Sequence, residues 1–138
     1  MRTTNIVRVD SKGRITIPLF IREAMDIEEG RFLVLIADLE KKELILTPVS
    51  SEKGVVYEIS VEMLDKPGAL AEFSIIIKNI GLDILASRCS TLQRGKIGEC
   101  TVIAEPISGE LSVEEIEKEL RSHDLIYLAR VKRLERGL

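Results

Sequence analysis

Four basic side chains near the N-terminus form the group of residues best suited to bind an anion: Arg8, Lys12, Arg14 and Arg22. Within residues 1–22, five Lys and Arg residues stand against one acidic residue, Asp10, although the whole protein has a net charge of −3. Cations held at fixed positions bind phosphate, and arginine also makes bidentate contacts with guanine. By itself the pattern is equally consistent with contact with double-stranded DNA and with a solvated outer face of a strand. We expect Asp10 to form an ion pair that orients a nearby arginine.

A second group of residues has the composition of a site for a zwitterion. Gly68 is expected at the start of a helix, where unpaired backbone N–H groups attract a carboxylate. Its missing Cβ also lets a ligand approach the backbone. Asp83, with Asp65 as a second candidate, would then hold an ammonium group. The alternative is that Asp65 to Gly68 is only a turn and that this part of the chain serves to oligomerise the protein.

The sequence gives little support for catalysis or for metal binding. The single histidine, His123, falls at the end of a predicted helix, where stabilising the helix C-terminus is the simpler role. Cys89 and Cys100 have no CxxC spacing, and we expect two buried free thiols rather than a disulfide or a pair of metal ligands. We therefore predict a protein that is not an enzyme, with no catalytic residues, no metal and no cofactor.

The basic residues lie on a stretch that alternates with period 2. Outside a turn at residues 11–13, apolar residues occupy the odd positions between residues 7 and 17, which predicts two short strands. A short helix over Pro18–Met25 follows. Phe32–Ala37 is apolar without alternation, as in a strand buried on both faces, and Glu43–Pro48 returns beside it.

The first half of the chain is too small to form a stable core by itself. Fewer than about 50 residues rarely bury enough surface to fold alone. A strand buried on both faces therefore requires a second copy of the chain, and we predict an obligate homodimer.

The second half begins after a small polar linker, residues 49–54, VSSEKG. Beyond it we predict strands over residues 55–63, 84–93, 99–105 and 125–133. Helices are predicted after Gly68 and after Ser112, which forms a capping box with Glu115. The order β-α-β-β-α-β is the ferredoxin-like arrangement, so the predicted fold class is α+β.

The composition is that of a folded protein. The chain has 138 residues, of which 45% are hydrophobic. No apolar run approaches the roughly 20 residues that span a bilayer, and the first residues lack the apolar core of a signal peptide. We expect a cytoplasmic protein that does not contact a membrane.

The first half resembles a known family of DNA-binding domains. VDSKGRITIPLFIREAMDIEEGRFLVLIADLEKKELILTP is similar to the SpoVT/AbrB-type (MazE-like) domain, whose pattern begins V-D-x-x-G-R-x-x-I-P-x-x-I-R. The resemblance implies a swapped-hairpin β-barrel over residues 1–48, formed by two interleaved chains that present paired N-terminal hairpins to DNA. Arg14 and Arg22 match the basic positions of the family directly, and Arg8 and Lys12 match them approximately.

The second half resembles another family. EISVEMLDKPGALAEFSIIIKNIGLDILASRCS is similar to the first half of an ACT domain, whose turn reads D/N-x-P-G-x-L and whose helix leads into G-x-N/D-I. The resemblance implies an ACT domain over residues 55–138, whose copies pair side by side. In this family amino acids often bind where the Pro-Gly turn of one domain meets the second strand of a neighbour. The implied ligand-binding residues are Asp65, Gly68, Ala69, Leu70 and Asp83.

Together the two resemblances imply a prokaryotic transcriptional regulator that binds DNA and whose ACT domain oligomerises and senses an amino-acid effector. Because both halves are expected to self-associate, assembly beyond a dimer is open. Two alternatives remain. One is a regulatory subunit of a biosynthetic enzyme, and the other is an antitoxin-like protein that regulates its own synthesis.

Overall fold

The computed structural model describes residues 1–50 and 54–135. Residues 51–53 of the predicted linker and residues 136–138 of the predicted ACT domain lie outside the described residues. The contacts within one chain divide it into two compact units, residues 1–31 and residues 32–138. The predicted boundary after residue 48 stays a prediction, because a barrel interleaved between two chains would be held by contacts that one chain does not contain.

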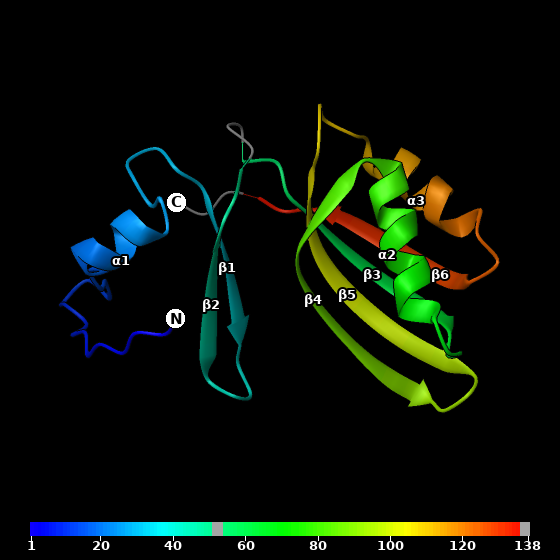
Figure 1. The fold of residues 1–138 in the computed structure, drawn as a ribbon, viewed down its shortest axis with the longest axis horizontal. Helices are drawn as coiled ribbons and strands as arrows, with labels where there is room; N and C mark the ends of the chain where they lie inside the picture. The colour runs from blue at the N-terminus through cyan, green and yellow to red at the C-terminus, as the bar shows by residue number, and fades with distance from the viewer. Residues whose placement is uncertain (51–53, 136–138) are drawn as a thin grey trace. The chain divides into compact units, whose positions relative to one another are not determined.

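The elements follow one another in the order shown in Figure 1. They are α1 (Leu19–Ala24), β1 (Leu33–Asp38), β2 (Glu43–Pro48), β3 (Tyr57–Leu64), α2 (Ala69–Ile80), β4 (Leu82–Gln93), β5 (Ile97–Pro106), α3 (Val113–Arg121) and β6 (Ile126–Arg133). From β3 onwards the order is β-α-β-β-α-β, and the sheet order is β4-β5-β3-β6 with antiparallel neighbours. The predicted α+β class is confirmed.

The core of the second unit lies between the four-stranded sheet and its two helices. Alternate residues of β3, from Tyr57 to Met63, are buried, which is the pattern of a strand with one face on the core. They pack against Phe73 and Ile77 of α2 and Ile116 of α3. Figure 1 shows both helices on the same face of the sheet.

The ends of the helices follow the sequence signals. The Ser112 side chain accepts a hydrogen bond from the Glu115 backbone N–H at 3.1 Å, as the capping box predicts. Gly81 ends α2 with φ of 102°, in the left-handed region that favours glycine. Gly68 precedes α2 with φ of 82°, so that a glycine is favoured there by the backbone alone. No helix among the described residues is long and apolar enough to cross a membrane.

The two cysteines are joined in a disulfide, so the prediction of free thiols is wrong. Cys89 of β4 lies directly opposite Cys100 of β5, with their Cα atoms 4.1 Å apart. The strand register shifts by one residue between Thr91 and Gln93. Without this shift Cys100 would face Ser90, and the sequence separation of 11 residues does not reveal it.

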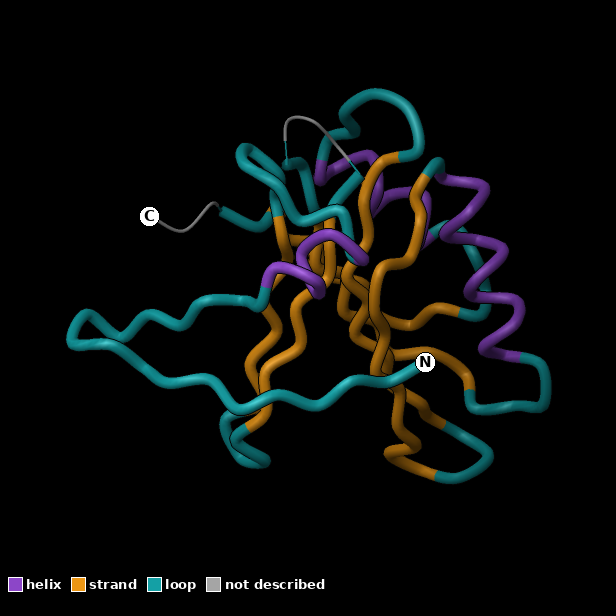
Figure 2. Tube along the Cα trace, turned by 60° about the vertical axis from the view of Figure 1, so that its left-hand side comes forward, coloured by secondary structure: helices purple, strands orange, loops and turns teal. Residues whose placement is uncertain are grey.

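The N-terminal arm contains the predicted turn but not the predicted strands. Figure 2 draws the arm before α1 as loop, and no strand lies between residues 7 and 17. The turn is closed by hydrogen bonds from Asp10 N–H to the Arg14 carbonyl at 2.9 Å and from Gly13 N–H to the Asp10 carbonyl at 3.1 Å. A strand needs a ladder partner. The described part of one chain does not supply one to this arm.

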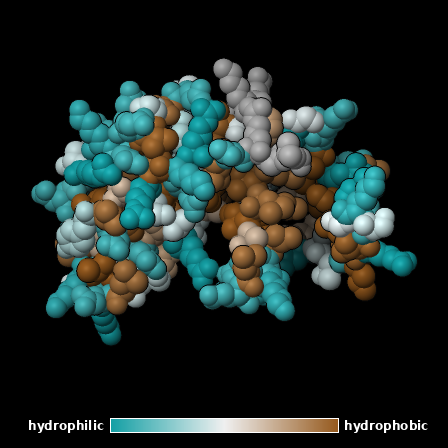
Figure 3. Space-filling model, turned by 180° about the vertical axis from the view of Figure 1, so that it is seen from behind, coloured by the Kyte–Doolittle hydropathy of each residue, from teal (hydrophilic) through white to brown (hydrophobic). Residues whose placement is uncertain are grey.

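The β1–β2 hairpin is covered on one face only. Val34 packs with Val49 and Val56 and is 8% exposed, whereas Leu35, its neighbour on the opposite face, is 61% exposed. The prediction that residues 32–37 are buried on both faces is therefore wrong for a single chain. Leu44 of β2 shares the exposed face through its pairing with Ala37. Figure 3 shows hydrophobic surface over this hairpin.

Candidate functional site

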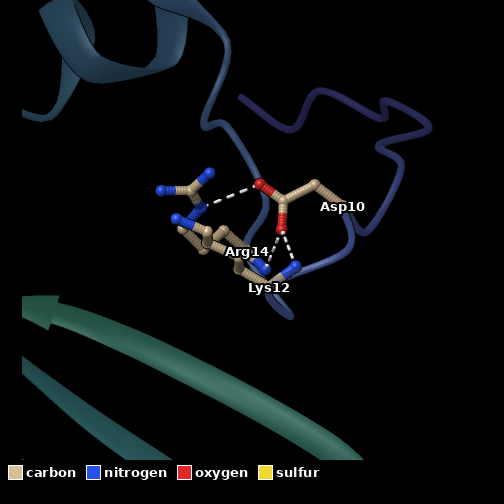
Figure 4. Close-up of polar contacts among 3 residues, drawn as sticks. All are labelled: Asp10, Lys12 and Arg14. Carbon is tan, nitrogen blue, oxygen red and sulfur yellow. Dashed lines mark hydrogen bonds and ion pairs between the residues drawn. The ribbon is translucent and has the colours of Figure 1, made fainter.

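Asp10 organises the turn that carries the first candidate site. One of its carboxylate oxygens, Oδ1, accepts hydrogen bonds from the backbone N–H groups of Lys12 at 2.8 Å and Arg14 at 2.9 Å. The other, Oδ2, binds the Arg14 Nε at 2.8 Å (Figure 4). The predicted ion pair between Asp10 and a nearby arginine is confirmed. The carboxylate thus fixes both the backbone of the turn and the direction of one guanidinium.

The hydrogen bonds at this turn favour the ionised form of Asp10. The backbone N–H of Arg14, followed by its guanidinium group, lowers the pKa of Asp10 below the ordinary value of 3.8. Near neutral pH the carboxylate is therefore ionised and the turn is in its closed form.

The four predicted DNA-binding residues are placed differently. Lys12 and Arg14 lie on the same turn, and Arg8 precedes it on the exposed arm. Within the described part of the chain, no ion pair joins Arg8 or Lys12 to an acidic side chain. Arg22, in α1, donates from Nε to the Ile17 carbonyl at 2.9 Å. It therefore holds the end of the arm against α1, a structural task that the sequence pattern did not reveal.

The same arm exposes apolar side chains next to its cations. Val9 is 61% exposed and Ile15 is 49% exposed, and α1 adds Leu19 and Phe20 to the exposed apolar residues. Such a set in a short segment forms an exposed apolar surface, a feature that is common at interaction sites.

The second candidate site is a pocket of about 250 Å³ between the turn before α2 and one end of β4. Four of the five predicted ligand-binding residues line it: Asp65, Gly68, Ala69 and Leu70. The other side of the pocket is made by β4 of the same chain, through Cys89, Ser90 and Thr91, and Lys66 also lines it. The sequence prediction missed these four residues. Three of them belong to β4, which joins the turn only through the tertiary fold, whereas Lys66 lies within the predicted turn itself.

Asp83 does not lie with the other four. It is the second residue of β4, whereas the pocket is at the opposite end of that strand. Helix α2 has 12 residues, about 18 Å of helix, and it separates Gly68 from Asp83 along the chain. Within one chain, the prediction that Asp83 and Gly68 share a binding site is wrong.

The polar groups around the pocket already have partners that define its shape. Asp65 accepts from the Gly95 N–H through Oδ2 at 2.7 Å, and its own N–H donates to the Lys96 carbonyl at 3.2 Å. Lys66 Nζ lies 3.4 Å from Glu72 Oε2. The helix N-terminus and the Lys66 ammonium can attract a carboxylate, while Asp65 can attract an ammonium group. The arrangement therefore suits a small zwitterion.

A larger cavity, of about 510 Å³, lies within the second unit and is lined by the β1–β2 hairpin together with strands β3, β4 and β5. At its edge, Arg88 of β4 pairs with Asp38 of β1 at 3.0 Å. The backbone N–H of Lys41 is the main cause that lowers the pKa of Asp38, and the Arg88 charge lowers it further. This ion pair connects the hairpin to the sheet.

Among the described residues, the remaining titratable and nucleophilic side chains do not gather into a catalytic or metal centre. In the described part of the chain, no group of three or more His, Cys, Asp and Glu residues is positioned to hold a metal ion. His123 lies just after α3, where its N–H donates to the Leu120 carbonyl at 3.3 Å, in the place that the sequence predicts.

Comparisons with known proteins give a structural similarity and no family. No protein-family model matches the sequence, and no curated protein matches it significantly. Among solved structures, the crystal structure of an unknown protein from Galdieria sulphuraria is similar with a TM-score of 0.47 and 20% sequence identity. The match covers 60% of this chain and 46% of that chain.

Proposed function

We propose that the protein is a DNA-binding transcriptional regulator, with a SpoVT/AbrB-type swapped-hairpin barrel at its N-terminus. The observation that carries this proposal is the Asp10 turn. It holds Arg14 by an ion pair of 2.8 Å and leaves that side chain 68% exposed. Lys12 lies on the same turn. A rigid turn with exposed cations suits contact with phosphate and base edges, because a fixed guanidinium loses little freedom on binding.

An obligate homodimer is part of this proposal. The arm lacks a ladder partner within the described chain, and both the arm and the β1–β2 hairpin expose apolar side chains. A second copy would supply the missing pairing and cover both surfaces, and two copies of Arg8, Lys12, Arg14 and Arg22 would frame a duplex.

The β-α-β-β-α-β unit acts in this proposal as an ACT domain with a ferredoxin-like fold, which oligomerises and senses an amino acid. The support is the pocket at Gly68, where a helix N-terminus, Lys66 and Asp65 face the end of β4. An effector that binds one arrangement of the ACT domains better than another would change the spacing of the DNA-binding dimers.

The DNA proposal is tested by fluorescence anisotropy with genomic DNA fragments over a series of salt concentrations. Lys12→Ala is expected to weaken binding and to reduce the slope of log K against log salt by about 0.9 for each phosphate that the variant no longer neutralises. Arg94→Ala, which removes an exposed arginine from the turn between β4 and β5, is the matched control. Unchanged affinity in both Lys12→Ala and Arg14→Ala would overturn the proposal. Arg22→Ala is a poorer test, because it also releases the Ile17 carbonyl.

The amino-acid proposal is tested by calorimetry of the whole protein against each of the twenty standard amino acids. Lys66→Ala and Asp65→Asn are expected to bind the amino acid more weakly than the wild type does. Lys78→Ala, at the far end of α2, and Asp83→Asn are the matched controls. If none of the twenty amino acids gives a heat of binding, oligomerisation would remain as the function of this unit.

Pull-down of the tagged protein from native extract distinguishes the regulator from its rivals. Recovery of a biosynthetic enzyme would favour a regulatory subunit, and recovery of a toxin would favour an antitoxin. The proposal expects only further copies of this chain and DNA.

A further inference from the structure

The Cys89–Cys100 disulfide forms part of the wall of the pocket at Gly68. Cys89 lines this pocket together with Ser90 and Thr91, opposite the turn at Gly68. We propose that Cys89 is a site of thiol–disulfide exchange with a small dithiol, and that its redox state sets the shape of the pocket. The evidence for the exchange site is the disulfide and the exposure of Cys89. The consequence of exchange for an amino-acid effector rests on the function proposed above.

The two cysteine residues differ in exposure. Cys89 is an exposed residue of the edge strand β4, whereas Cys100 is 1% exposed and lies in the core opposite Val61 of β3. A thiolate from solvent can therefore reach the Cys89 sulfur, while the Cys100 sulfur is shielded by the sheet and its helices. Exposed disulfides are the ones that exchange readily, in contrast to those enclosed in a core.

The exchange balances with a dithiol as the reductant. One thiolate of the dithiol attacks Cys89 Sγ, the disulfide bond breaks, and Cys100 leaves as a thiolate that takes a proton from water. The second thiol of the dithiol, as its thiolate, then attacks the mixed disulfide and releases Cys89, which is also protonated. The dithiol is oxidised to a cyclic disulfide, and the protein gains two thiols.

Reduction must change the wall of the pocket. Two thiols cannot occupy the space of one disulfide, because sulfur atoms that are not bonded have to lie at van der Waals separation. Cys100 is packed in the core at 1% exposure, so we expect the displacement to fall on Cys89, which lines the pocket. The next residue, Ser90, remains tied to Glu99 at 3.0 Å, and Asp65 remains tied to Gly95. The change is therefore confined to the pocket rather than spread along the hairpin.

Amide NMR of the whole chain, before and after treatment with dithiothreitol, tests the exchange site. The amides of Gly68, Ala69 and Leu70 are expected to shift on reduction, while that of Ala129, on the far edge strand β6, stays in place. Mass spectrometry after alkylation confirms how many thiols have been released. Cys89→Ser is expected to give the shifted amides without dithiothreitol and no further response to it. If this variant fails to fold, the wild-type comparison alone decides.

Two results would overturn the proposal. One is a disulfide that dithiothreitol leaves intact in the folded chain. The other is complete reduction with unmoved amides at Gly68, Ala69 and Leu70.

A second measurement separates the exchange site from amino-acid sensing. An equimolar mixture of the twenty standard amino acids is titrated into oxidised and reduced protein, with the pocket amides as the readout. We expect the apparent affinity to differ by about fivefold or more between the two states, the usual scale of coupling between sites. Equal binding in both states would overturn the coupling. No binding in either state, with amides that move on reduction, would refute amino-acid sensing and leave the exchange site standing.

Discussion

At the scale of single residues, Asp10 is the group on which the proposed DNA-binding surface depends. Its carboxylate accepts hydrogen bonds from two backbone N–H groups and from one guanidinium within a turn of five residues. An acidic residue close to DNA would be unfavourable if charge alone mattered. Its position is explained because it orients Arg14 and closes the turn that Gly13 permits with φ of 75°.

Replacing Asp10 separates orientation from charge. Asp10→Ala removes a negative charge, so electrostatics alone would predict tighter binding to DNA. We expect weaker binding instead, by about fivefold or more, because Arg14 loses its partner and the turn loses two hydrogen bonds. Asp10→Asn, which keeps an acceptor oxygen, should lose less. Fluorescence anisotropy measures both, and tighter binding by Asp10→Ala would contradict the assigned role.

The pKa of Asp10 predicts how the turn responds to acid. Because the pKa in the folded protein lies below 3.8, the carboxylate contributes stability that is fully present above pH 3.8. That contribution is lost as the pH falls through the lower, folded-state pKa. In Arg14→Gln the pKa of Asp10 should rise but stay below 3.8, because the backbone N–H of residue 14, the largest cause, remains. NMR titration of the Asp10 carboxyl carbon checks this, and an unchanged pKa would contradict a contribution from the guanidinium.

At the scale of elements, the two edges of the four-stranded sheet differ in whether side chains cover them. Side chains of α3 cover the outer edge of β6. Glu117 accepts from the Val131 N–H at 3.1 Å, and Arg121 donates to the Ala129 carbonyl at 3.1 Å. Such covering prevents pairing with another strand. Edge strand β4 pairs only with β5 among the described residues, and its outer edge is where the ACT proposal expects a neighbouring domain.

Removal of the cover on β6 should destabilise the unit. Glu117→Ala leaves the Val131 N–H without its acceptor and Arg121 without its ion pair. We expect the free energy of unfolding to fall by about 1–2 kcal/mol. Glu119→Ala, on the exposed face of the same helix, should change it by less than about 0.5 kcal/mol. Denaturant titration measures both, and equal losses would show that the edge contact adds nothing.

At the scale of the whole molecule, the β1–β2 hairpin connects the two halves of the sequence. Its inner face packs with Val49 and Val56, and Ser50 donates its N–H to the buried carboxylate of Glu105 at 2.9 Å. The start of the predicted linker is therefore docked on the second unit. The outer face of the hairpin, with Leu35 and Leu44, has no cover within the described chain.

Placing a charge on that outer face tests the proposed dimer. Leu44→Lys should raise the dissociation constant of the dimer by about a hundredfold or more. Each of the two copies would lose about 1.5–3 kcal/mol of apolar burial, and the two losses add. Leu39→Lys is the matched control, because Leu39 lies in the turn after β1 and is 83% exposed. Sedimentation velocity over a concentration series measures both variants, and an unchanged Leu44→Lys assembly would refute a dimer built on this face.

The sequence by itself determined the features that depend on neighbours within a few residues. The capping box at Ser112, the helix end at Gly81 and the alternation of β3 are such features, as is the ion pair of Asp10 with Arg14. Each involves groups that the chain brings together whatever the rest of the fold does. For the same reason Asp65, Gly68, Ala69 and Leu70 could be placed at one site in advance.

Only the tertiary structure decided what depends on distant segments. A one-residue shift in the β4–β5 register pairs Cys89 with Cys100, and the length of α2 carries Asp83 away from the pocket that Lys66 and Thr91 line. The apolar pattern of residues 32–37 indicated two faces in need of cover, but the packing of one chain covers only one. Register and packing between distant segments are long-range properties, set by how whole strands and helices fit together, and no local pattern contains them.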